Sequence, residues 1–519
     1  MSYTNYSCNR LEVTGTTTIN GALVSNTDQI SGFEYALAQG VQWDQSNSSS
    51  VLTRLGSTRG YAASSSPGDA ALPVHRDLKR CIMNDNGTVN YYLDPDNSID
   101  KQYTTTVTFG TTDGTTASKL VDSGADFVTD AVAAGMWVHN TTDDTYTMIT
   151  AVDDLNTLSL RDDIMVSGEA YTIGTAILNG DDGQVMVEIP KFYIKHSLSG
   201  TVHKWYISKY HLPGFEIHPA FLKDGFEVEY RYIGAFEGTM YDDNISAQCP
   251  DANIEDNRYA SGDKMCSVAG YYPKTKETIV ENRAMAEERG SGWLQQDYFL
   301  SAAIQLLYLV EYADFNSQSC IGMGRTQFSN GAWEAANQGN GKYIGRCGYS
   351  LADGNSSNAT DRASATNISA INTETDFTYH DYMTYRGIEN FFGNVWKWVD
   401  GLNSYGGKAY VCYKYSNFTS PANAAAESSL KNYEYIGQLE NSSNNYVDDI
   451  LDYDFGFLAT SVGGSESTYL TDYYYQSTLW RVALLGGGAD NGSKAGCFYW
   501  SLGKAASDGD VYIGGRLAY

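Results

Sequence analysis

Acidic residues stand in pairs in the C-terminal part of the chain, at Asp448 and Asp449 and again at Asp452 and Asp454. Two carboxyl groups that flank a sugar–sugar bond can hydrolyse it, one as general acid and the other as base or nucleophile. The chain has 62 Asp and Glu residues, so pairs of acids arise in it by chance. These pairs keep glycan hydrolysis open as an alternative without predicting it.

Three other segments resemble catalytic or nucleotide-binding motifs, but each lacks a required residue. GSGWL (290–294) and GGSES (463–467) fall short of the Gly-x-Ser-x-Gly turn that exposes a serine nucleophile. GGADNGSK (487–494) has the two glycines of a phosphate-binding loop, followed by Ser-Lys where Lys-Ser or Lys-Thr is needed. We therefore expect no catalytic residue, no cofactor and a protein that is not an enzyme.

The eight cysteines are scattered singly along the chain. None lies in a CxxC pair, and none has zinc-ligand spacing with the seven histidines. The acidic run DPDNSID (94–100) lacks the glycine and the twelfth-position acid of a calcium-binding loop. The sequence predicts no metal site, and cysteines that are buried as small apolar residues.

Aromatic residues in FFGNVWKWVDG (391–401) point to structure instead of chemistry. Gly393 and Asn394 predict a tight turn, after which Trp396 and Trp398 lie on the same face of a strand. Two indole rings on one face supply a large apolar contact area. We expect these four residues to belong to the structural core and not to touch a ligand.

Charge and composition narrow the classes of partner. A formal net charge of -28 argues against nucleic acid, since no basic stretch offsets it. The N-terminal MSYTNYSCNRLEV has no basic end followed by an apolar run, and no stretch approaches the ~20 apolar residues of a membrane helix. We expect a soluble protein made in a cytoplasm, without membrane insertion. The 41 Tyr against 18 Phe are typical of a binding surface.

The segment DYFLSAAIQLLYLVEYADF (297–315) predicts one long helix, because Leu300, Ile304 and Leu307 recur at helical spacing. A polar stretch and closely spaced strands follow, so the predicted fold class is α+β with elaborate loops.

Composition divides the chain into five parts: an attachment or oligomerisation segment (1–42), a first β-rich fibre region (43–100), an inserted small β-sandwich or barrel (101–177), a continuing β-rich region (178–290) and a C-terminal domain (291–519).

GNVWKW (393–398) resembles the GNVWEW segment of formylglycine-generating enzymes and their non-catalytic relatives, which share the C-type-lectin fold. The closing GGGADNGSKAGCFYWSL and IGGRLAY resemble the last strand pair of that family. The enzymes need a cysteine just before a His-Arg segment, whereas Cys497 is followed by Phe498 and Tyr499. The resemblance implies a C-type-lectin-like C-terminal domain, preceded by small β-rich modules and without the oxidase activity.

Further segments resemble phage tail-fibre proteins of the same fold: WDQSNSSSVLTRLG (43–56), NGDDGQVMVEIPKFY (179–193), LVEYADFNSQ (309–318) and IENFFGNVWKWVDG (388–401). Some members of that group are rewritten at their C-terminus by diversity-generating retroelements. The resemblance implies a receptor-binding protein of the virion that attaches to a bacterial surface protein or glycan. It also implies other phage tail proteins as partners and a homotrimer.

The final strand–loop stretch interleaves glycines and tryptophans with polar and aromatic residues that have no evident packing role. Such a stretch keeps its backbone conformation while its surface side chains can change, which suits the recognition of a receptor. The predicted receptor-binding residues are Ala489, Asp490, Lys494, Cys497, Tyr499, Ser501, Lys504, Asp508, Asp510 and Tyr512. The tyrosine-rich Tyr469–Tyr475 is the next candidate. A glycan-degrading tailspike, a formylglycine-generating-type enzyme and a purely structural tail or baseplate subunit remain as alternatives.

Overall fold

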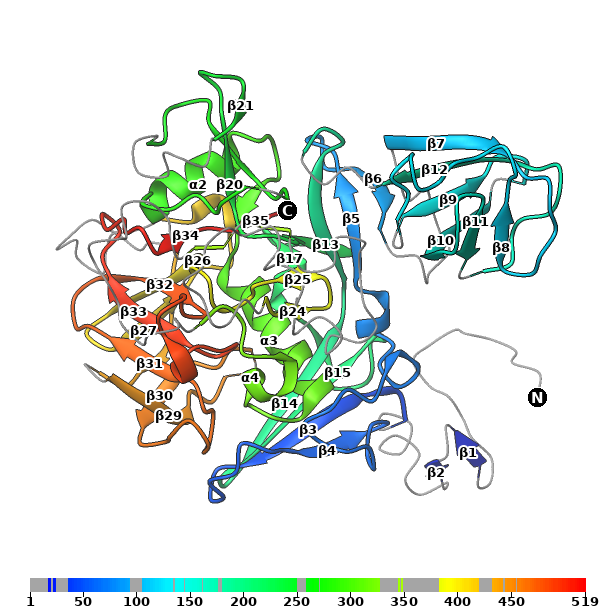
Figure 1. The fold of residues 1–519 in the computed structure, drawn as a ribbon. Coiled ribbons are helices and arrows are strands. Elements are labelled where there is room, and N and C mark those ends of the chain that lie inside the picture. The colour runs from blue at the N-terminus through cyan, green and yellow to red at the C-terminus, as the bar shows by residue number, and fades with distance from the viewer. Residues whose placement is uncertain are drawn as a thin grey trace.

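The computed structural model of the chain is built mostly from short strands, with few helices (Figure 1). It describes residues 17–19, 22–24, 36–93, 105–133, 136–143, 145–160, 162–175, 180–249, 258–269, 271–326, 344–345, 347–348, 382–419, 432–441, 444–453 and 455–519. The acidic run 94–100 and most of the polar stretch 329–374 lie outside these residues, as do Asp454 and most of the segment 1–42. No helix in the described ranges is long and apolar enough to cross a membrane.

Two sheets combine residues from the N-terminal part, the middle and the C-terminus of the chain. A five-stranded sheet has the order β16-β14-β15-β3-β4, and a six-stranded sheet the order β23-β35-β19-β13-β5-β6. Their strands are β3 (Gln39–Asp44), β4 (Thr53–Gly56), β5 (Lys79–Met83), β6 (Val89–Tyr92), β13 (Gln184–Pro190), β14 (Tyr193–Ser199), β15 (Val202–Ser208), β16 (Glu216–Ile217), β19 (Tyr230–Gly234), β23 (Leu294–Gln295) and β35 (Leu517–Ala518).

These pairings change the predicted division of the chain. One hydrophobic core contains Val41, Ile82, Trp205, Leu300 and Trp500, which come from four of the five predicted parts. The regions 43–100, 178–290 and 291–519 therefore share a core, and the first two are not small modules in front of the third. The cause is non-local pairing: β3 lies beside β15, and β35 lies between β19 and β23.

Helix α3 (Tyr298–Tyr312) confirms the predicted helix. Asp297 caps it by accepting a hydrogen bond from the Leu300 amide at 3.0 Å, and Ala313 ends it in the left-handed conformation. All of its residues are buried, not only the predicted apolar face. Buried polar residues are accommodated by specific partners: Gln305 donates to the Cys497 carbonyl at 2.7 Å.

A nine-stranded sheet forms most of the C-terminal half, in the order β28-β27-β26-β32-β33-β31-β29-β30 with β34 beside β26. Its central strand β26 begins at Trp396, as the sequence predicts. The strands are β26 (Trp396–Tyr405), β27 (Lys408–Val411), β28 (Glu434–Gln438), β29 (Asn444–Ile450), β30 (Ala459–Val462), β31 (Tyr473–Gln476), β32 (Arg481–Leu485), β33 (Trp500–Lys504) and β34 (Ile513–Gly514).

Shorter elements fill the remaining described chain. The helices are α2 (Ile279–Glu287) and α4 (Ser317–Ile321), with 3-10 turns η1 (Asp69–Ala71), η2 (His75–Asp77), η3 (Pro219–Phe221), η8 (Tyr415–Asn417) and η10 (Gly492–Lys494). The small sheets contain β1 (Thr17–Ile19), β2 (Ala22–Val24), β17 (Leu222–Lys223), β18 (Phe226–Glu227), β20 (Thr239–Asp242), β21 (Ala247–Gln248), β22 (Lys264–Cys266), β24 (Thr384–Tyr385) and β25 (Ile388–Glu389).

Residues 105–175 form a six-stranded sheet of their own, in the order β7-β12-β9-β10-β11-β8. The strands are β7 (Thr105–Thr111), β8 (Lys119–Val121), β9 (Trp137–Asn140), β10 (Thr145–Val152), β11 (Thr157–Leu160) and β12 (Ala170–Thr175). A separate core around Phe127 and Ile149 lies beneath it. Figure 1 shows this unit to one side of the other sheets. Its own sheet and its own core fit the predicted insertion at 101–177.

A buried polar cluster surrounds the turn of the GNVWKW motif. The Lys397 ammonium lies 2.9 Å from Glu237, and both side chains are almost completely buried. Asn394 donates to Glu237 and to the Gly345 carbonyl, while its own carbonyl oxygen Oδ1 accepts from the Gly345 amide at 2.7 Å. Gly393 has a φ of 79°, and an added Cβ would lie 3.0 Å from the Arg325 carbonyl oxygen. The turn therefore requires glycine at Gly393.

Both tryptophans of the motif are buried in one cluster with Val482, Leu484 and Ile513. Trp398 has no exposed surface, and its indole N–H donates to the Glu277 carbonyl at 3.0 Å. Trp396 is 7% exposed and packs edge-on against Tyr499, with ring centroids 4.6 Å apart. The structure therefore places Trp398 in the interior and Trp396 directly beneath the surface.

We predict that replacing residues 101–177 by a short Gly/Ser linker leaves the rest of the chain folded. The flanks are held together without the inserted sheet, because the Tyr91 hydroxyl donates to Asp182 at 2.8 Å. Thermal unfolding of the shortened protein should show the main transition at the temperature of the full chain. A shortened chain that is unfolded would contradict the independence of this unit.

We predict that Glu237→Gln and Lys397→Met each cost about 3–5 kcal/mol of unfolding free energy, since each leaves a buried charge without its partner. Burial already lowers the pKa of Lys397 to about 8. The double variant should lose less than the sum of the two, as measured by chemical denaturation. Strictly additive losses would show that the two side chains do not act as a pair.

Candidate functional site: a tyrosine patch on the C-terminal sheet

The loop between β32 and β33 lies on the face of the C-terminal sheet and is fixed by backbone hydrogen bonds. Its Ala489 amide donates to the Asn394 carbonyl at 3.0 Å, and its Gly492 amide donates to the Thr326 carbonyl at 2.6 Å. Gln318 on α4 donates to the Gly492 carbonyl at 2.9 Å. The loop is thus held just before η10 and at its first residue, which limits the positions that its side chains can adopt.

Three tyrosines and one lysine form a contiguous group beside this loop, which we call the tyrosine patch: Tyr446, Tyr473, Lys494 and Tyr499. Tyr473 meets Tyr446 edge-on at 5.1 Å and Tyr499 at 5.9 Å between ring centroids. The Lys494 ammonium lies 4.5 Å from the centre of the Tyr473 ring, a cation–π contact. The patch offers aromatic area and a positive charge in a preset arrangement.

The patch is layered from its base to its surface. Tyr499 is 6% exposed and rests on Trp396, while Tyr446 and Tyr473 are half-buried and Lys494 is exposed. The Tyr446 hydroxyl lies 3.2 Å from Ser493 Oγ, which ties β29 to η10. Tyr446, Tyr473 and Lys494 are therefore the members that an external ligand can touch.

Asp490 stands next to the patch with its carboxyl folded toward Gly488. Although part of Asp490 faces solvent, the surrounding protein atoms raise the pKa of its carboxyl to about 6. Lys494 favours the charged form but does not offset this desolvation. The carboxyl consequently titrates in the range of mildly acidic media.

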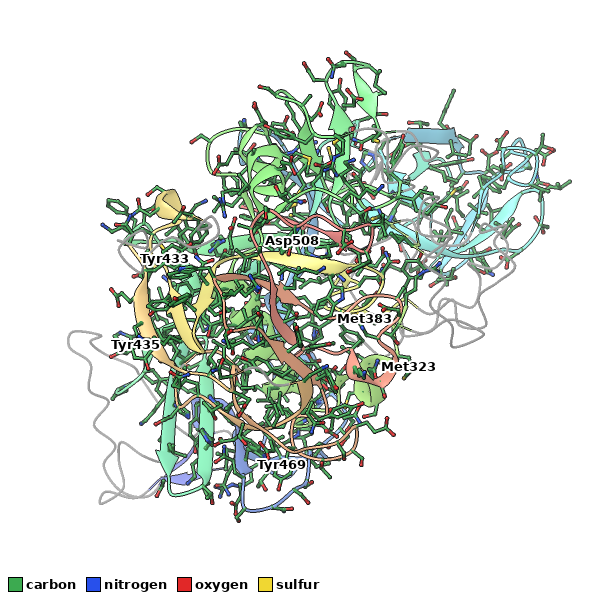
Figure 2. All side chains as sticks on the ribbon, turned by 90° about the vertical axis from the view of Figure 1, so that its left-hand side faces the viewer. Met323, Met383, Tyr433, Tyr435, Tyr469 and Asp508 are labelled. Carbon is green, nitrogen blue, oxygen red and sulfur yellow. The ribbon has the colours of Figure 1, made fainter. Side chains whose placement is uncertain are left out.

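Four other predicted residues form a second group on the same face. Lys504 lies 2.6 Å from Asp510, and the Tyr512 hydroxyl donates to Asp510 at 2.7 Å. Asp508 accepts from the Ala505 amide at 2.8 Å and closes a turn. Figure 2 looks onto this face, with Asp508 in its upper part and Tyr469 near its lower edge. Tyr512 packs against the apolar cluster that contains Trp396 and Tyr499, so both groups rest on one base.

The structure removes Cys497 from the predicted receptor-binding residues. Cys497 has no exposed surface, and its amide donates to Ser317 Oγ at 3.0 Å. Burial raises the pKa of its thiol well above the usual value. The residue precedes β33 and faces helix α3, where no external ligand can reach it.

Ala489 and Ser501 belong to the predicted receptor-binding residues, but both are almost inaccessible to solvent. Ala489 is 6% and Ser501 7% exposed, so neither offers contact area to a receptor in this structure. Tyr446 contributes to the patch but was not among the predicted residues, because it lies on β29, far from the final strands in sequence. Tyr473 belongs to the tyrosine-rich segment that was the next candidate.

The paired acids that could suit glycan hydrolysis are engaged with other parts of the chain. Asp449 accepts hydrogen bonds from the side chain of Gln45 and from the Ile450 amide. Asp452 lies 3.8 Å from His196 Nδ1 on β14. These contacts join the segment after β29 to the five-stranded sheet.

A comparison of the chain with protein-family models gives no match, and a comparison with curated protein sequences gives none either. The likeness to phage tail-fibre proteins thus rests on the motif residues quoted above.

We predict that Asp490→Asn stabilises the protein at pH 7.5 and not at pH 4. The raised pKa means that folding disfavours the charged carboxylate, so the wild-type protein loses stability as pH rises from about 4 to about 6. Solvent screening limits the gain at pH 7.5 to on the order of 1 kcal/mol. Thermal unfolding at both pH values checks this, with Glu434→Gln on β28 as the charge-matched control. Equal effects of Asp490→Asn at both pH values would contradict the assignment.

Proposed function

We propose that this chain is a receptor-binding protein of a phage tail, and that it attaches the virion to a bacterial surface through the tyrosine patch. The observation that carries the proposal is the contact of Tyr446 on β29 and Tyr473 on β31 with Lys494, which lies on a loop fixed by backbone hydrogen bonds. Tyrosine supplies large contact area at a low cost in side-chain entropy. Lys494 and Asp490 add charges of both signs at its border.

The chemistry of the patch suits a protein or a glycan receptor. An aromatic ring stacks on the apolar face of a sugar or on an apolar side chain, while the tyrosine hydroxyls and Lys494 donate hydrogen bonds. The net charge of -28 keeps nucleic acid outside the proposal. A non-catalytic role is part of the proposal, because the recognised motif lacks the His-Arg segment after Cys497.

The finer assignment of the fold also belongs to the proposal. We propose a C-type-lectin-like arrangement around β26, β32 and β33, supported by the GNVWKW turn at the start of β26 and by the buried helix α3. A homotrimer in the virion, bound to other tail proteins, follows from the likeness to tail fibres. Rewriting of the loop residues by a retroelement is compatible with the exposed positions of Asp490 and Lys494.

We predict that the combined variant Tyr446→Ala, Tyr473→Ala, Asp490→Ala and Lys494→Ala folds but no longer adsorbs to cells. Interface energy is concentrated in few residues, so Tyr473→Ala alone should weaken adsorption about tenfold or more. Tyr499 is left in place because its ring supports the patch from below. Labelled protein is incubated with a panel of bacterial strains, and retention on cells is measured by flow cytometry.

Tyr435→Ala is the matched control for the adsorption experiment. Tyr435 is 56% exposed and lies on β28, at the opposite edge of the sheet from β29. The control should adsorb like the wild-type protein. A combined variant with unchanged thermal stability and undiminished adsorption would place the receptor site elsewhere. A wild-type protein that no strain retains would favour a purely structural tail subunit.

A further inference from the structure

Two histidines and one aspartate meet where the five-stranded sheet contacts the segment after β29. His196 on β14 and His203 on β15 lie on the same face of a hairpin, because their cross-strand partners are Trp205 and Leu198. Asp452 follows β29 and reaches them from the C-terminal sheet. One ligand atom from each of the three side chains lies within 4.8 Å of the other two.

The spacing of the two imidazoles matches that of two ligands on one metal ion. His196 Nε2 and His203 Nδ1 are 3.2 Å apart. Two nitrogens bound to a tetrahedral zinc ion, each at about 2.0–2.1 Å, would lie about 3.4 Å apart. The Asp452 carboxylate lies 3.8 Å from His196 Nδ1, the other nitrogen of that ring, and its side chain is 59% exposed. Ligation would therefore require the carboxylate to turn toward the point between His196 Nε2 and His203 Nδ1.

Aromatic neighbours hold the imidazole of His203 in a defined orientation. The rings of His203 and Trp205 are stacked with centroids 5.1 Å apart. Trp43 on the neighbouring strand β3 also stacks on His203, with ring centroids 5.6 Å apart. These aromatic neighbours fix the ring planes and exclude water.

Charge and access also fit a cation. Asp449, three residues before Asp452, also lies near His203 and adds negative charge on this side of the hairpin. The exposed carboxylate of Asp452 provides an entry path from solvent, while the two histidines close the inner side. Two imidazoles and one carboxylate leave a fourth position for water, as in open zinc sites.

We propose that His196, His203 and Asp452 bind a transition-metal ion of the zinc type. The bound ion connects the β14–β15 hairpin to the strand that carries Tyr446, and so braces the sheet on which the tyrosine patch lies. This proposal does not depend on receptor binding, because it is tested by metal binding alone. The sequence analysis predicted no metal site, because Asp452 is about 250 residues from the histidines and His-x6-His is not a recognised ligand spacing.

Metal binding is tested on tag-free, full-length protein that has been stripped with a chelator and dialysed. Titration with Zn²⁺ in a calorimeter should give one ion per chain. Co²⁺ in its place should give the intense visible absorption of a tetrahedral ion. His196→Gln and Asp452→Asn should each weaken Zn²⁺ binding about tenfold or more. Asp452 is exposed, so Asp452→Asn removes a ligand without disturbing the core.

His211→Gln and Glu466→Gln are the matched controls, since both residues are exposed and lie outside the cluster. Both controls should bind Zn²⁺ like the wild-type protein. Zn²⁺ should raise the unfolding temperature of the wild-type protein and of the controls, and not that of Asp452→Asn. Absence of stoichiometric binding by the wild-type protein would show that the histidines are only a hydrogen-bonded pair. Unchanged binding by both ligand variants, or equal weakening by His211→Gln, would overturn the assignment of the ligands.

Discussion

The buried ion pair between Glu237 and Lys397 is the constraint on which the C-terminal half depends. An ion pair without solvent is stable only if its remaining donors and acceptors are satisfied. Here Asn394 donates to Glu237, and the Lys397 ammonium donates to the Gly393 carbonyl at 2.6 Å. The turn before β26 can therefore adopt few conformations. The Asn394 carbonyl in turn accepts from the Ala489 amide, so the buried pair determines the position of the surface loop.

This arrangement separates the residues that make the fold from those proposed to recognise a receptor. Trp398 and helix α3 are buried on all sides, and changes there would alter packing. Lys494 and Asp490 are attached to the same frame and partly face solvent, so their replacement alters the packing of the core less. Tyr473 lies between these two groups, with one side against Tyr499 and the other facing Lys494. A surface of this kind can vary in sequence while its backbone remains fixed.

Local signals in the sequence predicted local structure. The apolar spacing of Leu300, Ile304 and Leu307 located α3, and Gly393 and Asn394 form the predicted turn before β26. Contacts between residues far apart in the chain produce no such local pattern in the sequence. Pairing of β3 with β15 joins residues about 160 positions apart, which periodicity cannot reveal. For the same reason the sequence predicted Asp490, Lys494 and Tyr499 as binding residues but not their neighbour Tyr446. It also predicted Cys497 as a binding residue, although tertiary packing turns this side chain into the interior.

We propose that the loop fixed by the buried polar cluster is the surface that meets the bacterial cell. Hydrogen–deuterium exchange of the protein, alone and bound to envelopes of a strain that retains it, tests this claim most directly. We expect bound envelopes to slow exchange in the loops 487–495 and 505–512, and to leave exchange in the inserted unit 105–175 unchanged. Protection confined to 105–175, with exchange in both C-terminal loops unaltered, would contradict it.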